Sequence, residues 1–380
     1  MLYYAFGVLV IPMEAELGWT RAQTSGAFSL GLLIAGLAAV PVGRLVDRRG
    51  ARLPMTLGSL AGVLLMFAWS RVTTLPALYV VWAGIGLAMS AVLYEVAFTV
   101  VAVWFRRQRA SATFLITMVA GLASTIFIPL TTWLVGQYGW RGALEVLALL
   151  LALGTVPLHA LVLRRSPAAL GLEVDGGLAQ AGLQTLPETS VTTRAALGGA
   201  PFWWLSGAFA LARFAGAAVG AHLVPLLLER GYSPGFVALA VGAIGPLQLL
   251  GRLVFAPALG RWSLITVTAV MFGLLALAFA ALLVPGVGGV WVFMALFGVS
   301  DGASTLSRAG LIAELYGPAN YGSINGVLAL IVALVGALAP LLVGAVYAAA
   351  GGYTAALWGL ALSGLVAAGA VARVQTTVRR

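Results

Sequence analysis

The sequence predicts an all-α membrane protein with twelve transmembrane helices in two pseudo-symmetric six-helix bundles. The 380 residues are 62% hydrophobic and only 8% charged, with a mean hydropathy of +1.05, far more apolar than a soluble domain. Apolar runs of about 20 residues, enough to cross ~30 Å of hydrocarbon, recur along the chain. The tetrapeptide Gly-Arg-Leu-Val occurs at 43–46 and again at 251–254, which indicates an internal duplication.

Clusters of charges and turn residues divide the chain into twelve predicted spans. They are residues 1–14, 22–43, 53–70, 76–103, 110–135, 141–163, 200–228, 235–256, 264–284, 289–314, 322–349 and 353–373. These runs are too long, and alternate too little, for barrel strands. The one long polar segment predicts a linker with little apolar content to fold on. The predicted domains are an N-terminal bundle at 1–163, the linker at 164–199 and a C-terminal bundle at 200–380.

The basic residues are all arginine, and their distribution predicts the orientation of the chain. With the N-terminus inside, the arginines of 43–52, 104–110, 164–199, 251–261 and the C-terminus are cytoplasmic. The arginines left outside are Arg21, Arg71, Arg141 and Arg230. This asymmetry follows the positive-inside rule and predicts a multi-pass inner-membrane protein with both termini in the cytoplasm. The net charge of +10 then reflects topology, and no nucleic-acid partner is expected.

Two further expectations follow from simple counts and from the start of the chain. The sequence contains no cysteine, which excludes disulfides and thiolate metal sites, and we expect no metal and no cofactor. The chain opens inside an apolar run without a charged leader, so no cleavable signal peptide is expected.

The segment Gly43-Arg44-Leu45-Val46-Asp47-Arg48-Arg49-Gly50, between the second and third of twelve spans, resembles the signature loop of the major facilitator superfamily. The resemblance covers the whole chain and implies that fold. It also implies a gating loop formed by Gly43, Arg44, Asp47, Arg48 and Gly50, with the acid in an ion-pair cluster. The second copy has Phe255 where the first has Asp47, so that cluster is in doubt in the second half.

Shorter pieces resemble the bacterial monocarboxylate-transporter-like branch of the same superfamily. These pieces are Leu17-Gly18-Trp19-Thr20-Arg21, Trp104-Phe105-Arg106-Arg107-Gln108-Arg109-Ala110, Gly139-Trp140-Arg141, His222-Leu223-Val224-Pro225-Leu226 and Arg230-Gly231-Tyr232-Ser233. The fifth span lacks the Gly-Pro-rich pattern of drug–proton antiporters, which counts against drug efflux.

Five ionisable side chains lie well inside the predicted spans, away from their ends, where a charge costs several kcal/mol unless it is paired or hydrated. Arg213 and Arg308 are the candidate anion anchors, because a guanidinium grips a carboxylate with two hydrogen bonds and stays charged. By the resemblance, the span of Arg213 lines the central cavity. Glu95 and Asp301 are the candidate proton-coupling acids, since an uncompensated carboxyl in the membrane favours its neutral form. His222 is a third candidate for proton coupling.

Alternative interpretations stay open for these residues. Glu95 and Arg308 lie at similar depth on corresponding spans, and we expect them to face each other, either as a structural ion pair or in coupling. Asp301 shares a helical stripe with Thr305 and could simply bond to it. For His222, a neutral imidazole satisfied by one hydrogen bond is the first interpretation, and a proton relay is the second. The side chains that could donate hydrogen bonds to a substrate are Tyr94, Gln248 and Asn325.

The function hypothesis is a monomeric secondary transporter that moves a small organic anion, a monocarboxylate, with protons by alternating access. No Gly-x-x-x-x-Gly-Lys pattern occurs and the chain contains no lysine, so it is not itself an ATP-driven pump. No nucleophile–base constellation indicates an enzyme. The alternatives are a proton-coupled exporter of amphipathic cations or drugs, with Glu95 as cation partner, and a receptor that kept the fold but lost transport. Two arginines in the membrane would repel a cation, which weakens the exporter hypothesis.

Overall fold

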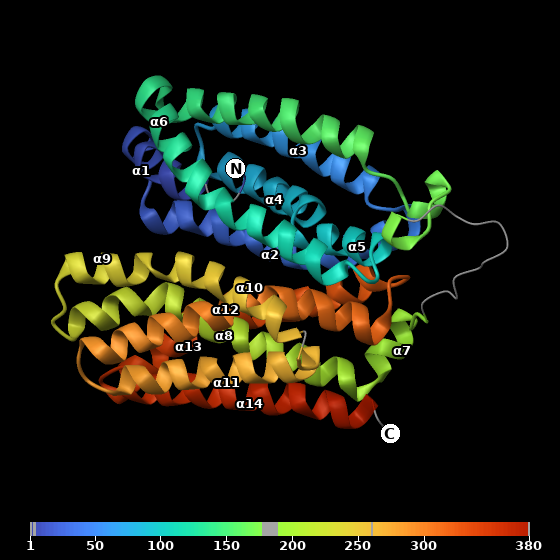
Figure 1. The fold of residues 1–380 in the computed structure, drawn as a ribbon. Helices are drawn as coiled ribbons and strands as arrows, with labels where there is room; N and C mark the ends of the chain where they lie inside the picture. Colours follow the sequence, from blue (N-terminus) through green and yellow to red (C-terminus); the bar gives the residue numbers. More distant parts are fainter. Residues whose placement is uncertain (1, 3–4, 177–188, 260, 379–380) are drawn as a thin grey trace. The chain divides into compact units, whose positions relative to one another are not determined.

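The computed structural model describes residue 2 and residues 5–176, 189–259 and 261–378. Within these ranges the chain is almost entirely helical (Figure 1). It forms two compact units. The first contains Met1–Ala112, Val119–Ser190 and Tyr316–Leu330, and the second contains Thr113–Met118, Val191–Leu315 and Ile331–Arg380. The division of the sequence into 1–163, 164–199 and 200–380 stays a prediction.

The helices of the N-terminal half are α1 (Ala5–Leu17), α2 (Arg21–Arg49), α3 (Arg52–Ser70), α4 (Leu75–Val92), α5 (Tyr94–Trp104) and α6 (Arg109–Pro157). A π-helical turn, Leu158–Val162, continues α6. Gly139 has a φ of +67° and is not helical, which glycine alone adopts at little cost. The chain turns back there, as the two arms of α6 in Figure 1 show, so α6 contains two membrane spans.

The linker ends in α7 (Thr193–Gly198). The helices of the C-terminal half are α8 (Ala200–Glu229), α9 (Pro234–Gly242), α10 (Ile244–Leu259), α11 (Leu264–Leu283), α12 (Val287–Tyr316), α13 (Tyr321–Ala350) and α14 (Thr354–Val378). Helix α13 is shared between the units, because its residues up to Leu330 pack in the first unit and the rest in the second.

Ten helices of the described chain are long and apolar enough to cross a membrane. One of them, Arg109–Val162, holds two spans because of the turn at Gly139. The helix α1, with 13 residues, is the remaining short span. The predicted all-α fold with twelve spans is therefore confirmed.

The structure differs from the predicted spans in three places. Helix α2 continues to Arg49, so the arginine-rich segment from Gly43 is helical and only Gly50 and Ala51 separate α2 from α3. Cations at a helix C-terminus are favourable with the helix dipole, which explains the extension. The spans predicted as continuous at 76–103 and 235–256 are each broken.

The break in the first of these spans lies at Leu93, whose backbone is extended with φ −90° and ψ −166°. No glycine or proline lies next to it, so no sequence signal marked this break. In the second span, Ala243 separates α9 from α10, beside Gly242, Gly245 and Pro246, which weaken the helix locally. Discontinuous membrane helices leave backbone groups available, and transporters commonly use such places as binding sites.

Two of the family-like segments meet in the first unit. Gly18, with φ +69°, ends α1, and Thr20 caps α2 through reciprocal hydrogen bonds with Gln23. Arg141, after the turn at Gly139, binds Glu16 at 2.8 Å, and the indole of Trp140 donates to the same carboxylate. These motifs therefore join α1 to the second arm of α6.

The core of the first unit is aromatic. Trp69 and Trp82 are fully buried, with ring centroids 5.0 Å apart, and Phe6 packs on both rings. Beside this cluster the backbones of α2 and α4 touch, since a Cβ on Gly86 would lie 2.1 Å from the carbonyl oxygen of Gly31. Small residues allow such close crossings in membrane helices.

The predicted linker is more structured than its composition suggests. Residues Pro167–Leu170 and Val174–Gly176 form 3-10 turns. The carboxylate of Asp175 accepts the backbone N–H groups of Arg106 and Arg107, each at 2.9 Å, and of Gln108 at 3.3 Å. Gln108 is the N-cap of α6 and offers no side-chain cap of its own. Asp175 therefore caps, from the linker, the turn at 106–108 that leads into α6.

We expect Asp175→Asn to loosen this attachment. Asp175 has φ +68°, and asparagine tolerates that conformation but loses the charge-assisted hydrogen bonds. Burial acts to raise the pKa of Asp175, but the N–H groups of Arg107, Arg106 and Gln108 outweigh it and lower the pKa. Hydrogen exchange of amides 106–108 at pH 7 should become about tenfold faster in the variant.

The same shift sets the pH dependence of the parent protein. Because the folded pKa of Asp175 is lowered, its contribution is fully present above the unfolded value of about 3.9 and is lost as the pH falls through the folded pKa. Protection of the three amides in the parent should therefore fall below about pH 4. The matched control is Glu173→Gln, at a half-buried residue of the same segment whose side chain makes no hydrogen bond to a described residue. Equal exchange in the Asp175 and Glu173 variants would contradict the cap.

Candidate functional site

A cluster of charged side chains lies inside the second unit. The carboxylate of Asp301 on α12 accepts a hydrogen bond from the amide of Gln248 on α10, at 2.8 Å. The positive charges of Arg213 on α8 and Arg252 on α10 both act on this carboxylate. Three of the predicted site residues, Arg213, Gln248 and Asp301, are therefore brought together by three different helices.

Glycines fix the geometry of this cluster by letting α10 and α12 touch. A Cβ on Gly302 would lie 2.0 Å from the carbonyl oxygen of Gln248, and one on Gly251 would lie 2.2 Å from that of Val299. Both contacts involve backbone atoms, which cannot swing aside. The residue before Gly302 is Asp301, so the crossing holds the carboxylate against the Gln248 side chain.

Arg252 is a site residue that the sequence analysis missed. It was counted among the cytoplasmic arginines, but it lies within α10 and donates from Nη1 to the carbonyl oxygen of Thr117 at 2.7 Å. Its Nε atom is buried and has no hydrogen-bond partner. Its place in the second Gly-Arg-Leu-Val copy was the available signal. Because that copy lacks an acid, its arginine can act on Asp301 of the neighbouring helix.

Arg213 offers its guanidinium group. The residue is exposed, and its side chain makes no hydrogen bond or ion pair with another residue of the described chain. Two guanidinium groups and one carboxylate leave the cluster with one positive charge in excess. Such an arrangement inside a membrane protein can hold an anion.

The other predicted acid, Glu95, lies in the first unit at the start of α5, directly after the break at Leu93. The side-chain amide of Asn325 on α13 donates a hydrogen bond to its carboxylate. Asn325 is fully buried, and its carbonyl oxygen Oδ1 has no hydrogen-bond partner. Tyr94 stacks on Phe98, with ring centroids 5.2 Å apart. Thus Glu95, Asn325 and Tyr94 are predicted site residues that gather at one helix break.

Arg308 and His222 are the two remaining predicted residues with an ionisable side chain. Arg308 is half-buried on α12 in the second unit, and its meeting with Glu95 stays a prediction. His222 on α8 bonds through Nε2 to the carbonyl oxygen of Pro340 at 2.9 Å and through Nδ1 to the hydroxyl of Tyr353 at 3.3 Å. A carbonyl only accepts, so Nε2 carries the proton and Nδ1 accepts from the tyrosine. Both ring nitrogens are engaged, and a proton relay through His222 stays a prediction.

The gating motif forms a helix cap. Asp47, on the last turns of α2, accepts the backbone N–H groups of Gly322 at 2.8 Å and Ser323 at 2.7 Å, and also the hydroxyl of Ser323. These N–H groups belong to the first turn of α13, which has no partners for them within its own helix. The negative charge also suits the positive end of the helix dipole. Within the described chain Asp47 makes this cap and no ion pair, which differs from the expected ion-pair cluster.

Glycines bring α2 and α13 close enough for this cap. A Cβ on Gly43 would lie 2.0 Å from the carbonyl oxygen of Gly322, and one on Gly326 would lie 2.5 Å from that of Ala39. In the second copy, Phe255 stands in the place of Asp47 and is buried against Val267, Met271, Ala303 and Leu306. Apolar packing there replaces the cap.

The remaining motif residues lie at the end of α2. Arg44 and Arg48 are exposed. Gly50 has φ +79°, and a Cβ there would lie 2.9 Å from Cγ of Arg165. Arg165 in turn donates to the carbonyl oxygen of Arg48 at 3.0 Å. The motif therefore fastens the start of the linker as well as the start of α13.

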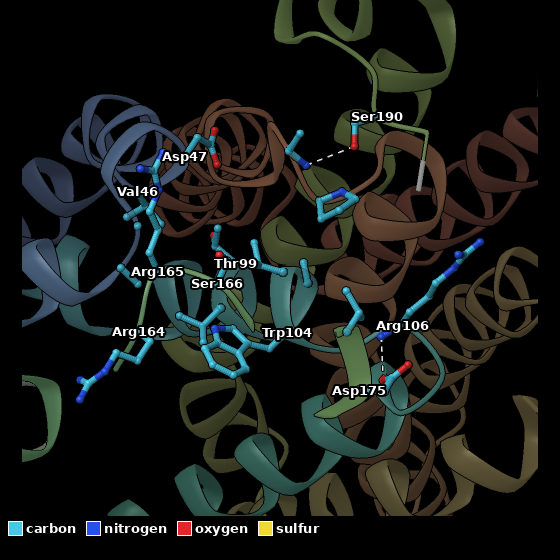
Figure 2. A pocket seen from close by; sticks show the side chains of 18 of the residues that line it. Val46, Asp47, Thr99, Trp104, Arg106, Arg164, Arg165, Ser166, Asp175 and Ser190 are labelled. Carbon is cyan, nitrogen blue, oxygen red and sulfur yellow. Dashed lines mark hydrogen bonds between the residues drawn. The ribbon is translucent and has the colours of Figure 1, made fainter. Parts of the chain in front are cut away.

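A cavity of about 1130 Å³ opens beside this end of α2 within the first unit (Figure 2). Its lining mixes apolar and charged side chains and comes from α2, α5, the linker and the turn before α13. The residues that mark its sides are Asp47, Trp104, Arg106, Arg165, Asp175 and Ser190. The hydroxyl of Ser190 accepts the N–H of Ala319 at 3.2 Å, so both described ends of the linker are bonded to the walls of the cavity.

The fold and the charge cluster define a polytopic helical membrane transporter. The family model described as Major Facilitator Superfamily matches residues 1–340. The chain therefore belongs to the major facilitator superfamily, and it is a transporter and not an enzyme.

Relatives and solved structures agree with this family. The chain is 30% identical over 371 residues to an uncharacterized 38 kDa protein of Thermoproteus tenax, covering 96% of this chain and 89% of that protein. It is 30% identical over 150 residues to monocarboxylate transporter 13 of Bos taurus, covering 38% of this chain and 34% of that transporter.

Two solved structures share the fold over nearly the whole chain. The E. coli fucose:proton symporter has a TM-score of 0.72 and 15% identity, covering 98% of this chain and 96% of that one. A bacterial homologue of the iron transporter ferroportin, in an outward-facing state, has a TM-score of 0.75 and 13% identity, covering 99% and 97%.

Proposed function

We propose that this transporter moves a small organic anion, of the monocarboxylate class, together with protons. The observation that carries the proposal is the exposed guanidinium of Arg213 beside the carboxylate of Asp301. An arginine fork matches a carboxylate with two parallel hydrogen bonds and cannot lose its charge. A monocarboxylate would neutralise the excess charge of the cluster.

Asp301 provides the route to proton coupling. While it is ionised it competes with a substrate carboxylate for Arg213 and Arg252. When it is protonated, the net charge of the cluster rises from one positive charge to two, which strengthens the attraction for an anion. Substrate binding then favours protonation and protonation favours binding, as linkage requires. The named relatives support both parts, since one is a monocarboxylate transporter and one structural neighbour is a proton symporter.

The first unit contains a second group of proposed functional residues. Tyr94 and Asn325 would offer hydrogen bonds at the helix break, and Glu95 is a second carboxyl for protons. Arg308 on α12 is the second proposed anion anchor, and His222 a further proton-coupling residue. The residues Gly43, Arg44, Asp47, Arg48 and Gly50 would gate the inner side.

The proposed cycle is alternating access by the two repeats, 1–163 and 200–380, joined by the linker 164–199. The protein would act as a monomer in the inner membrane, with both termini in the cytoplasm as the arginines indicate. In that orientation the Asp47 cap and the cavity beside it lie on the cytoplasmic side.

The test uses purified protein in liposomes with an inward proton gradient and labelled lactate. Asp301→Asn is close in shape and can still accept from Gln248, but it cannot carry a charge. We expect the variant to lose accumulation driven by the gradient and to keep gradient-free exchange of lactate. Glu314→Gln, at an exposed acid of the same helix, is the matched control.

The outcomes separate the hypotheses. Gradient-driven accumulation in Asp301→Asn equal to the parent would overturn the coupling role of Asp301. Absence of lactate movement by the parent, together with proton-coupled movement of a lipophilic cation that Glu95→Gln abolishes, would favour the cation exporter instead.

A further inference from the structure

A glycine of α13 lies directly against the side chain of Arg213. A Cβ on Gly336 would lie 2.9 Å from Cγ of Arg213, 3.4 Å from Nε and 3.6 Å from Cδ. Cγ is near the root of the side chain, so it cannot move aside by a small rotation at the tip. A larger residue at 336 would force Arg213 into another rotamer or push α8 and α13 apart.

On the other side, Asp301 lies against α8 itself. A Cβ on Gly216, one turn after Arg213, would lie 3.6 Å from Oδ1 of Asp301. The carboxylate and the arginine stem are thus close neighbours on the same helix face. Yet the guanidinium is exposed and makes no hydrogen bond to Asp301 or to any other described residue.

This separation needs a cause, because a guanidinium near a carboxylate normally closes a bidentate pair. The geometry points to Gly336 as the positioning residue of Arg213: its missing side chain lets the arginine stem run along α13, which keeps the guanidinium open for an anion. The inference rests on the proposed anion site at Arg213. It adds a residue that touches no substrate and acts through the direction of the arginine.

The consequence for binding is specific. With the aliphatic part of the Arg213 side chain held along Gly336, Arg213 and Asp301 stay close enough to interact electrostatically. The guanidinium group nevertheless stays available to a substrate carboxylate. If the aliphatic part of the Arg213 side chain is displaced, the guanidinium group points in another direction or forms hydrogen bonds with Asp301. The affinity for the anion should then fall, while the movement of the loaded carrier, which does not depend on this direction, is retained.

The first test needs no transport measurement. We compare the melting temperatures of the parent, Gly336→Ala, Arg213→Ala and the double variant in detergent. We expect Gly336→Ala to lower the melting temperature by about 2 °C. The double variant should recover most of that loss, because the clashing stem is gone. Gly344→Ala is the matched control, since its Cβ would meet only Cε1 of His222 at an ordinary 3.7 Å.

The second test measures lactate uptake in liposomes. We expect Gly336→Ala to raise KM about tenfold, or about 1.4 kcal/mol of lost binding, with Vmax within twofold of the parent. Gly344→Ala should keep both parameters. A merely structural defect would lower Vmax, through loss of active protein, and leave KM unchanged.

The outcomes distinguish the inference from the proposed function. No coupling between positions 213 and 336 in the melting temperatures, or an unchanged KM in Gly336→Ala, overturns the positioning role. Coupling in the melting temperatures with no lactate uptake by the parent overturns the proposed substrate and leaves the placement of Arg213 by Gly336 intact.

Discussion

Arg213→Ala is expected to raise the KM for lactate about 100-fold, because it removes two charge-assisted hydrogen bonds of about 1.5 kcal/mol each. The loss is this large because the guanidinium makes no hydrogen bond to a described residue in the absence of substrate. Removing it leaves Arg252, which is already bonded to the carbonyl oxygen of Thr117, as the remaining cation acting on Asp301. The measurement is proton-driven uptake in liposomes over a wide range of lactate concentrations.

Arg213→Lys separates charge from shape. Lysine keeps the positive charge but lacks the planar fork, so it should retain part of the affinity, with a KM about tenfold above the parent. Arg194→Ala is the control, because Arg194 is an exposed arginine of the same unit with no hydrogen bond to a described residue. A parent-like KM in Arg213→Ala would show that the anion binds elsewhere, with Arg308 as the next candidate.

The fold was predictable from coarse features of the sequence. Long apolar runs and their spacing identify spans, because the bilayer imposes a minimum length on a helix that crosses it. The duplicated Gly-Arg-Leu-Val segment identified the two related halves. Glycine and proline marked the break at Ala243 only weakly, and nothing in the sequence marked the extended backbone at Leu93, since tertiary packing decides there.

The candidate site was predictable in its residue types but only partly in its contacts. The cost of a charge in the membrane was enough to select Arg213, Asp301 and Glu95. Their partners depend on which helices cross and at what height. The contact of Gly302 with Gln248 decides that height, and a single sequence does not reveal it. Arg252 was missed for the same reason.

In the linker, the sequence predicts less structure than the described residues have. Its polar composition indicated little tendency to fold alone, and that physical argument is sound for an isolated segment. Asp175 nevertheless accepts three backbone N–H groups of the turn between α5 and α6. This segment of the linker is therefore held by a turn elsewhere in the chain, a contact that the composition of the linker does not predict.

Gly43→Ala is expected to open the contact between α2 and the start of α13. The new Cβ would lie 2.0 Å from the carbonyl oxygen of Gly322 and 2.5 Å from its carbonyl carbon, so the two backbones must separate. Asp47 lies one turn further along the same face of α2, and its hydrogen bonds to Gly322 and Ser323 are then lost. Losing two charge-assisted bonds costs about 3 kcal/mol, which raises the population of the undocked α13 about 100-fold.

A single cysteine reports this opening, because the natural chain contains none. Ser323 is 5% exposed, and Ser323→Cys keeps the backbone donors to Asp47, so its labelling by a maleimide should be slow until α13 leaves α2. We expect labelling to become about 100-fold faster when Gly43→Ala is added. Gly154→Ala, a glycine of the first unit with no atom within 4 Å of its added Cβ, should leave the rate unchanged. Equal rates in both backgrounds would mean that the crossing at Gly43 does not hold α13 in place, and the proposed gate would have to depend on contacts other than the Asp47 cap.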